Sequence, residues 1–487
     1  MPDENPARAT AREAIALLIG AAGFTEHRPP PHPLPPDGPL GWAGYDAARE
    51  RASARTGEEE SVVYGTGVVG DRACVLLSFE FGFLGGSLGL RTGDRLAAAY
   101  ELALTRRLPL LALVATGGSR MQEGMVALTQ LQRVAAASTR LRAAGLPQIA
   151  VVRDPTTGGG WATVGAGADV VLALPGAQVG FAGSRVRPPD ADPYAYSAEG
   201  QFAAGQVDAV VPADELTGTV THWLRALGPH ENLPAAPVPR ALSAGGVGTG
   251  AGAGTEAGAG ALSAAGTPST AGTESLADRG PVAPLPETGR EAVARARDPR
   301  RPRAEAYLAD YFAVRLPLHG DRSGATDPGL LCGFGLCADG RPVAYVAQCG
   351  TPTRPAGYRS AARTIRLADR LGVPVLTLVD TPGAANDAEA ERAGAGAAIA
   401  DTFAAIAAAR VPVTTLVIGE GGSGGALALA APDNTHVTVD SYFSVIAPEL
   451  AAAILKRPPS ETGATADRLR LRPQDLADLG FARSIVG

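Results

Sequence analysis

The sequence contains only four cysteines, and their positions exclude the common uses of cysteine clusters. They are Cys74, Cys332, Cys337 and Cys349, and they form no paired Cys-x-x-Cys set. A zinc site is therefore not predicted, and no bound metal is expected. The first residues, MPDENPARAT, lack a basic stretch followed by an apolar one, which excludes the pattern of a secretory signal peptide. Scattered thiols without an export signal predict a cytoplasmic protein.

Long apolar runs and long basic runs are also missing. Gly, Pro or a charged residue interrupts each apolar stretch well short of the length needed to span a membrane. The formal net charge is -6 and no long basic cluster occurs, so neither a membrane nor a nucleic acid is expected as a partner. No catalytic motif contains any of the six histidines, which are His27, His32, His222, His230, His319 and His436.

Large side chains are almost absent from one internal stretch, residues 234–289. Its central part reads SAGGVGTGAGAGTEAGAGALSAAGTPSTAGTES, a composition that buries too little to offset the entropy of ordering the backbone. We therefore predict a disordered, flexible linker over 231–300. A 487-residue chain is long enough for two or three domains. The predicted domains lie at 41–230, after an N-terminal extension (1–40), and at 301–487.

Apolar segments that look like strands occur twice, once in each predicted domain. LPLLALVATGG (108–118) and VPVLTLVDTPG (373–383) are β-rich runs that each end in a glycine turn. The offset within a pair stays at about 265 positions, which unrelated αβ units would rarely maintain. Two more pairs match in the same order, 146–162 with 411–428 and 168–183 with 435–449.

Helical stretches at 118–145, 357–372 and 395–410 separate the predicted strands. A short amphipathic helix at 11–20 and a proline-rich extended segment at 28–40 precede them. Strands that alternate with helices are typical of βαβ units and a mostly parallel sheet. We therefore predict an α/β fold class with two homologous domains. From pattern alone, two ordinary doubly wound domains with tight glycine turns are the alternative.

Two glycine-rich loops follow predicted strands, TTGGG at 156–160 and GGSGG at 421–425. Each precedes a segment of small residues that can start a helix, where backbone N–H groups point outward and carry partial positive charge. Without Cβ atoms, a reacting oxygen can approach these groups closely. Two adjacent N–H groups so placed form an oxyanion hole. The alternative is a helix start in which glycine serves packing alone.

Other interpretations of these loops and of their neighbours are less well supported. GEGGSGGA lacks the Gly-Lys-Ser/Thr ending of a phosphate-binding P-loop. A nucleophile elbow would make Ser423 a hydrolase nucleophile, but the following histidine, His436, comes too early for a triad. Asp380 in DTPG is a candidate for acid/base or metal chemistry, although a turn-capping role is favoured.

Several long motifs resemble known carboxyltransferases in the order of that family. The first half resembles the β subunit of bacterial acetyl-CoA carboxylase carboxyltransferase in FEFGFLGGSLG (79–89), ATGGSRMQEG (115–124), DPTTGGGWA (154–162) and PGAQVGFAGSRV (175–186). The second half resembles the α subunit in GYRSAARTIRLADRLGVPVLTLVDTPGA (357–384), VIGEGGSGGALAL (417–429) and YFSVIAPELAAAIL (442–455). The resemblance covers about residues 40–225 and 303–487.

The resemblance implies two tandem crotonase-like domains of ββα units and a carboxyltransferase component of a biotin-dependent acyl-CoA carboxylase. Carboxybiotin on a separate carrier protein would supply the carboxyl group, and a biotin carboxylase would reload it. The acceptor would be acetyl-CoA or a related short acyl-CoA such as propionyl-CoA. The active site would lie between the N-half of one protomer and the C-half of another, so a homodimer or a higher homo-oligomer is expected.

By position in the motifs, the resemblance also implies the site residues. Gly158 and Gly159 would bind the thioester oxygen, and Gly424 and Gly425 the ureido oxygen of biotin. The remaining contacts to coenzyme A would come from Gly117, Gly118, Ser119, Arg120, Phe181, Ala182 and Gly183. The remaining contacts to biotin would come from Gly422, Ser423, Ala426, Val445 and Ile446.

The sequence departs from the family in loops that flank this site. The four-cysteine zinc ribbon of bacterial β subunits is absent, and the segments 187–200, 350–356 and 385–396 differ from the family pattern. Acyl chain length is therefore open, and so is a specialised role in secondary metabolism. Two other functions also stay open, an acyl-CoA decarboxylase that uses the same enolate chemistry and a non-catalytic scaffold subunit. A crotonase-type hydratase is disfavoured because its paired glutamates are not evident.

Overall fold

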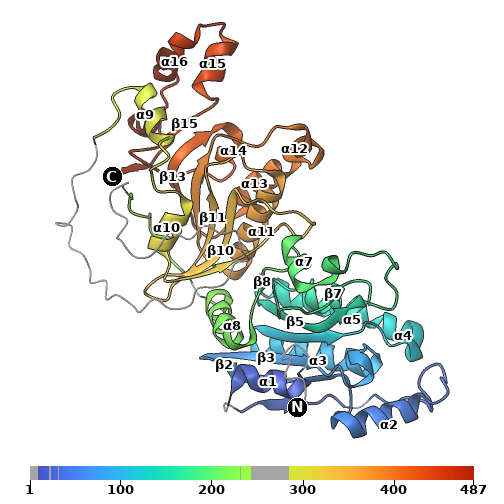
Figure 1. Ribbon diagram of the computed structural model, residues 1–487. Coiled ribbons are helices and arrows are strands. Elements are labelled where there is room, and N and C mark those ends of the chain that lie inside the picture. The colour runs from blue at the N-terminus through green and yellow to red at the C-terminus, as the bar shows by residue number, and fades with distance from the viewer. Residues whose placement is uncertain (1–8, 21–22, 31, 231, 243–283) are drawn as a thin grey trace.

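The computed structural model describes residues 9–20, 23–30, 32–230, 232–242 and 284–487. Figure 1 shows two lobes, the first coloured blue to green and the second yellow to red, each built around its own sheet. Both sheets have eight strands. The predicted organisation into two α/β units is therefore visible directly in the arrangement of the chain.

The first lobe contains α1 (Ala11–Ile19), β1 (Thr25–His27), α2 (Tyr45–Thr56), β2 (Val62–Val69), β3 (Arg72–Phe79), α3 (Leu90–Arg106), β4 (Leu110–Thr116), α4 (Gly124–Leu128), α5 (Gln130–Ala143), β5 (Gln148–Thr157), α6 (Gly158–Gly160), β6 (Val170–Ala173), β7 (Val179–Gly180), α7 (Ala198–Ala203), β8 (Ala209–Val210) and α8 (Ala213–Leu227). A wider helical turn (Trp161–Gly165) follows α6 directly. The predicted helix at 118–145 is thus two helices, α4 and α5.

The second lobe contains α9 (Gly289–Ala296), α10 (Ala304–Tyr311), β9 (Val314–Pro317), β10 (Leu330–Leu336), β11 (Pro342–Gln348), α11 (Pro355–Leu371), β12 (Val375–Thr381), α12 (Ala388–Arg392), α13 (Ala395–Ala408), β13 (Val413–Gly422), α14 (Ser423–Leu427), β14 (Thr435–Thr438), β15 (Tyr442–Ser444), α15 (Pro448–Ile454), α16 (Thr462–Arg468), α17 (Pro473–Asp478) and β16 (Ser484–Val486).

The two sheets have the same topology. Their strand orders are β1-β2-β3-β4-β5-β6-β8, with β7 beside β5, and β16-β14-β13-β12-β11-β10-β9, with β15 beside β13. Strands run parallel from β3 to β8 and from β11 to β16, and the other end of each sheet is antiparallel. The central strands β4 and β12 are buried throughout, as expected of parallel strands covered on both faces.

The predicted repeat is confirmed element by element. Helices α11 and α13 begin and end 265 positions after α3 and α5, and strands β12, β13 and β14 follow β4, β5 and β6 by the same offset. Even an irregularity recurs, because the strand register shifts before Thr116 pairs with Thr156 and again before Thr381 pairs with Gly421. Positions 265 apart are therefore direct equivalents in this part of the two lobes.

Residues 9–20 and 23–27 are an integral part of the first lobe. The predicted amphipathic helix is confirmed as α1, whose N-terminal N–H, on Ala11, donates to the carboxylate of Glu80 at 2.8 Å. Strand β1 then pairs antiparallel with β2. The predicted separation of residues 1–40 as an extension is not observed, because α1 needs the sheet to cover its apolar face, formed by Ala11, Ala14, Ile15 and Leu18.

Both ends of the predicted linker belong to the second lobe. Ala236, in the described segment 232–242, is 3% exposed and joins the core around α10. Within 284–300, helix α9 packs its alanines against Tyr442. The prediction was wrong here because α9 buries only small side chains, which are interspersed with charged residues in the sequence. The central part of the predicted linker, 243–283, lies outside the described residues.

Helix α8 connects the two lobes. Trp223 of α8 is 2% exposed and packs edge-on against Phe334 of β10, with ring centroids 6.2 Å apart. Nearby, the buried carboxylate of Asp208 accepts hydrogen bonds from Arg322 at 2.5 Å and from Arg363 at 3.1 Å, both in the second lobe. Burial opposes the charged form, but the two guanidinium groups hold the pKa of Asp208 below its usual value. The lobes therefore share one continuous core.

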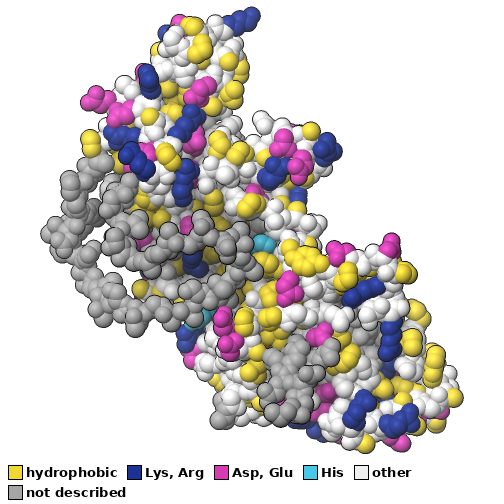
Figure 2. Space-filling view, viewed as in Figure 1, with side chains coloured by type: hydrophobic (Ala, Val, Ile, Leu, Met, Phe, Trp, Pro, Cys, Tyr) yellow, Lys and Arg dark blue, Asp and Glu magenta, His cyan; other side chains and the backbone are white. Residues whose placement is uncertain are grey.

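The surface carries mixed charge. Figure 2 shows acidic and basic side chains interspersed over the visible face of both lobes, with apolar side chains between them. Such a mixture creates no broad field of one sign on that face. Among the described residues, no helix combines the length and the apolar character needed to cross a membrane.

Candidate functional site

In the first lobe, strand β5 leads into a glycine turn that starts a helix. Gly158 has a φ of 65°, a left-handed conformation that glycine adopts without strain. Its N–H donates to the carbonyl of Phe181 at 3.0 Å, and no side chain caps the helix. The first N–H groups of a helix have no partner within it. The N–H groups of Gly159 and Gly160 are therefore the donors that this turn presents.

A neighbouring loop supports the first turn. A methyl group placed on Gly158 would lie 2.9 Å from the Cα of Gly118, and one placed on Gly160 would lie 2.5 Å from Cγ2 of Thr116. The N–H of Gly118 donates to Oγ1 of Thr116 at 3.0 Å. The predicted coenzyme A residues Gly117 and Gly118 thus lie beside the turn, and Gly117 is exposed.

The second lobe repeats this turn with a serine in place of the first glycine. Ser423 has a φ of 56° and starts α14, again without a side-chain cap. Gly383 donates its N–H to Oγ1 of Thr381 at 3.1 Å, as Gly118 does to Thr116 in the first lobe. Gly424 is exposed, and a methyl group placed on it would meet no heavy atom within 4 Å. The second turn is therefore open to solvent.

The two predicted glycine pairs differ by one position in the repeat. The constant offset makes Ser423 the equivalent of Gly158, and Gly424 the equivalent of Gly159. The N–H of Gly158 is already used by a carbonyl, so the first-lobe pair that corresponds to Gly424 and Gly425 is Gly159 and Gly160. Because the three consecutive glycines are identical, the sequence alone does not show which two correspond to Gly424 and Gly425.

Two buried side chains hold the second turn from beneath. The hydroxyl of Tyr358 donates to the carbonyl of Gly425 at 3.0 Å, and Nε2 of Gln348 donates to the same carbonyl at 3.3 Å. Both side chains belong to fully buried residues. Burial raises the pKa of Tyr358 above its usual value, so the hydroxyl stays protonated and can donate. The first lobe has Gly93 at the position of Tyr358, so this support exists only in the second lobe.

Arg120 is not placed for the predicted contact with coenzyme A. Its side chain is fully buried and donates to both carboxylate oxygens of Glu60, at 2.9 and 2.8 Å, and to Glu123 at 3.3 Å. Burial would raise the pKa of Glu60, but the guanidinium group lowers it to about 2. Arg120 also donates to the carbonyl of Ser87 at 2.8 Å. The guanidinium is therefore sealed inside the lobe, where it fixes the loop that carries Ser119.

The other residues predicted to contact coenzyme A lie at the rim of the first turn. Phe181 is 72% exposed, and Ala182 and Gly183 are half-buried, as is Ser119. Strand β7 pairs with the end of β5 and thereby places Phe181 next to Gly158. An apolar side chain therefore stands free beside the first glycine turn.

The residues predicted to contact biotin surround the second turn in the same way. Strand β15 pairs with the end of β13, which places Val445, 73% exposed, and Ile446, half-buried, beside the turn. Ser423 is exposed, whereas Gly422 and Ala426 are buried under the turn. Phe181 and Val445 thus occupy matching places in the two lobes.

The structure assigns Asp380 to an internal ion pair. Its fully buried carboxylate accepts from Arg301 at 2.6 Å and from Arg303 at 3.2 Å. Arg301 also donates to the carbonyl of Ile418 in β13 at 3.1 Å. The sequence interpretation missed these arginines, although the run RRPR (300–303) is visible. Because its carboxylate is committed and sealed, Asp380 does not serve as an acid, a base or a metal ligand.

The nucleophile-elbow interpretation is also excluded. The two ring nitrogens of His436 contact the hydroxyl of Ser484 at 2.7 Å and the side-chain oxygen of Asn434 at 3.1 Å. His436 is therefore not available to activate Ser423. Within the described ranges, no three His, Cys, Asp or Glu side chains are grouped so that they could hold a metal ion.

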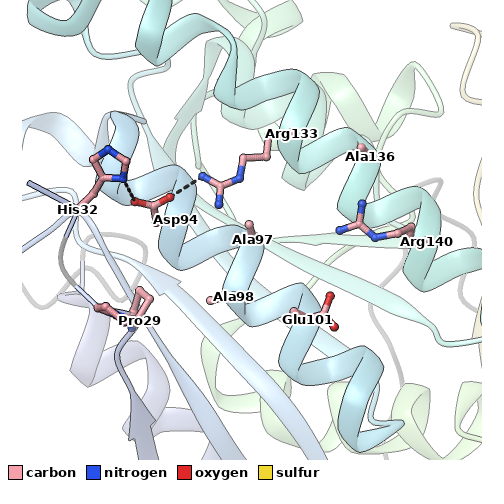
Figure 3. A pocket seen from close by; sticks show the side chains of 10 residues that line it. Pro29, His32, Asp94, Ala97, Ala98, Glu101, Arg133, Ala136 and Arg140 are labelled. Atoms are coloured by element: carbon pink, nitrogen blue, oxygen red, sulfur yellow. Dashed lines mark hydrogen bonds and ion pairs between the residues drawn. The ribbon is translucent and has the colours of Figure 1, made fainter. Parts of the chain in front are cut away.

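A cavity of about 660 Å³ lies elsewhere on the first lobe, between the proline-rich segment and helices α3 and α5. Figure 3 shows Asp94 between His32 and Arg133, with Glu101 and Arg140 farther along the two helices. None of the predicted site residues lines this cavity. It is thus separate from both glycine turns.

Family models match both lobes. A carboxyl transferase domain matches residues 40–210, and an acetyl co-enzyme A carboxylase carboxyltransferase-like model matches residues 287–487. Among the curated relatives, the acetyl-coenzyme A carboxylase carboxyl transferase subunits beta/alpha of Saccharopolyspora erythraea are 36% identical over 488 residues, covering 96% of this chain and 76% of the relative. A probable biotin-dependent acyl-coenzyme A carboxylase beta3 subunit of Mycobacterium bovis is 32% identical over 455 residues, covering 90% and 82%.

A solved structure of transcarboxylase 12S with hydrolysed methylmalonyl-coenzyme A bound is similar along nearly the whole chain. The TM-score is 0.72 at 21% sequence identity, with 99% of this chain and 87% of the other covered. At that identity the likeness concerns the fold, and it confirms the predicted tandem crotonase-like arrangement.

Proposed function

Because the chain belongs to the acetyl-CoA carboxylase carboxyltransferases, with a β-like half followed by an α-like half, we propose that it carboxylates the α-carbon of a short acyl-CoA. The donor is carboxybiotin, and the acceptor is acetyl-CoA or a close relative such as propionyl-CoA. One observation carries this proposal. The two lobes present the same uncapped helix start after the same strand, and therefore two separate pairs of main-chain donors.

The reaction creates negative charge on a thioester oxygen, and the first turn supplies donors for it. The N–H groups of Gly159 and Gly160 would bind the acyl-CoA carbonyl and stabilise it as the enolate forms. Each such donor contributes on the order of 10²- to 10³-fold in rate in other enzymes. The buried Arg120 and its carboxylate partners keep the adjacent loop in place, and this loop would position the coenzyme A through Gly117 and Gly118.

The second turn fits the ureido group of biotin. Gly424 is open to solvent, and a methyl group placed on Gly425 would lie 2.6 Å from the hydroxyl of Tyr358. The main chain is therefore reachable from one side and supported on the other. When bound, carboxybiotin would supply the carboxyl group and, after losing it, a nitrogen able to accept a proton. The N–H groups of Gly424 and Gly425 would bind the ureido oxygen.

Exposed apolar side chains on each lobe support a homodimer. In the first lobe, Met121 and Met125 are 71% and 66% exposed, and in the second lobe Leu450 and Ile454 are 58% and 70% exposed. Apolar surface of this kind marks an interface. We propose that the first lobe of one subunit covers the second lobe of its partner, so that the two turns face one cavity.

A separate biotin carrier protein and a biotin carboxylase complete the proposed reaction cycle. The only lysine in the sequence, Lys456, lies in ILKRP and not in the Met-Lys-Met motif of biotin attachment. We propose that the biotin arrives on another protein. We place this assembly in the cytoplasm, which agrees with the four unpaired cysteines.

The proposal is tested by incubating the purified protein with malonyl-CoA or methylmalonyl-CoA, with and without free biotin. Loss of the carboxyl group that depends on biotin is the expected result. Equal loss without biotin would instead make the protein a decarboxylase. No turnover, together with assembly of a carboxylase from its other components, would make it a scaffold subunit.

A further inference from the structure

The two turns also differ in a side chain on the helix beside them. Helices α5 and α13 are equivalent along their whole length, so Leu131 in the first turn of α5 corresponds to Gly396 in the first turn of α13. Leu131 contacts the first glycine turn, because a methyl group placed on Gly159 would lie 2.5 Å from its Cδ1. At Gly396 the added methyl group would have no heavy atom within 4 Å.

The difference between Leu131 and Gly396 changes how accessible each turn is. Gly159 is buried, and both methyl groups of Leu131 lie against it. Its equivalent Gly424 is exposed and has free space around it. The strands that lead into the two turns pair in the same register. The side chains that flank the turns therefore contribute to the difference in accessible space.

We propose that Leu131 and Gly396 determine which ligand each turn admits. This inference depends on the proposed function. A thioester carbonyl is narrow and can reach donors beside a leucine, whereas the fused rings of biotin need open space on both sides of the ureido oxygen. Leu131 thus restricts the first turn to a slender acyl group, and Gly396 leaves the second turn wide enough for the ring system.

The first test narrows the second turn. Gly396→Leu adds a side chain at an exposed helix position where the new Cβ would meet no heavy atom within 4 Å. The fold is expected to persist, since leucine favours a helix more than glycine does. Ala397→Leu, at the neighbouring exposed position, is the matched control. We expect Gly396→Leu to raise both the Kd of free biotin, measured by calorimetry, and its KM at least about tenfold. Coenzyme A binding should not change.

The second test widens the first turn. Leu131→Ala removes the side chain that lies against Gly159. We expect the ratio of kcat/KM for butyryl-CoA to that for acetyl-CoA to rise about tenfold, the size of effect that one or two methylene groups have in a pocket. Biotin affinity should stay at its original value. A merely structural defect would lower both kcat/KM values together and leave their ratio unchanged.

The outcomes separate this inference from the proposed function. If the unaltered protein binds biotin and turns over but Gly396→Leu has the same biotin Kd as Ala397→Leu, the inference is wrong and the function stands. A biotin Kd raised equally by both variants also overturns it. If the unaltered protein neither binds biotin nor turns over, the proposed function is wrong and the inference with it.

Discussion

The two glycine turns follow equivalent strands but have opposite surroundings. The first is covered, with Leu131 against Gly159 and a loop pinned by a buried arginine beside it. The second is open above Gly424 and is held from below by Tyr358. A repeated unit has thus kept the strand register and the main-chain donors while its two copies acquired different neighbours. The backbone carries the shared chemistry, and the side chains carry the difference in ligand.

The largest expected effect concerns the buried arginines that support each lobe. Arg120→Met leaves Glu123 without its cation and leaves Glu60 with only Arg49, 3.9 Å away, and should lower the free energy of unfolding by about 3–5 kcal/mol. Arg301→Met should cost less, because Asp380 keeps Arg303 as a partner. Urea unfolding of both variants, with the exposed Arg300→Met as control, measures the difference. An equal decrease in the free energy of unfolding for both variants would show that the two buried arginines stabilise their lobes to the same extent.

The second prediction compares a methyl group at equivalent positions. Gly424→Ala points into free space, so stability should change by less than about 0.5 kcal/mol, while carboxyl transfer falls on the order of 10²-fold as the ureido site is obstructed. Gly159→Ala meets Leu131 and should cost about 1–3 kcal/mol of stability as well. Thermal unfolding and steady-state kinetics separate these effects. Destabilisation by Gly424→Ala would contradict the open turn.

Acid should loosen the first lobe through Glu60. Its folded-state pKa of about 2 lies below the ordinary value of 4.5, so its charged form contributes stability above pH 4.5. That contribution is lost as the pH falls from about 4.5 towards 2. Unfolding midpoints in urea between pH 7 and pH 3 measure the loss. In Glu60→Gln the decrease of the unfolding midpoint with falling pH should become smaller by the contribution of Glu60. An unchanged decrease would exclude Glu60 as its origin.

The smallest effect is predicted for the hydrogen bond that Tyr358 makes beneath the second turn. Tyr358→Phe removes the hydroxyl that donates to Gly425 and should lower stability by about 1 kcal/mol. Because the donors above it become less fixed, biotin-dependent turnover should fall more than coenzyme A binding does. The exposed Tyr194→Phe is the control. Equal losses of biotin and coenzyme A affinity would argue for a general packing role.

Most of the fold was predictable from the sequence because repetition and strand patterns extend over many residues. The offset of about 265 positions and the two glycine loops located both lobes and both turns. Arg120 was misplaced because a motif position does not reveal whether a side chain is buried among carboxylates. The register of Gly158 to Gly160 was hidden for a related reason, since three identical residues carry no information about which N–H is used. Helix α9 was missed because its buried residues are few and small.

The way α8 is buried has a consequence for the integrity of the chain. Trp223 and its neighbours occupy a core that also contains β10 and α11, so the attachment between the halves does not depend on the peptide bonds that join them. Nicking the polypeptide between residues 243 and 283 should leave the fragments bound to each other. The covalent connection then contributes mainly a high effective concentration, and separately synthesised halves should reassemble into a working unit.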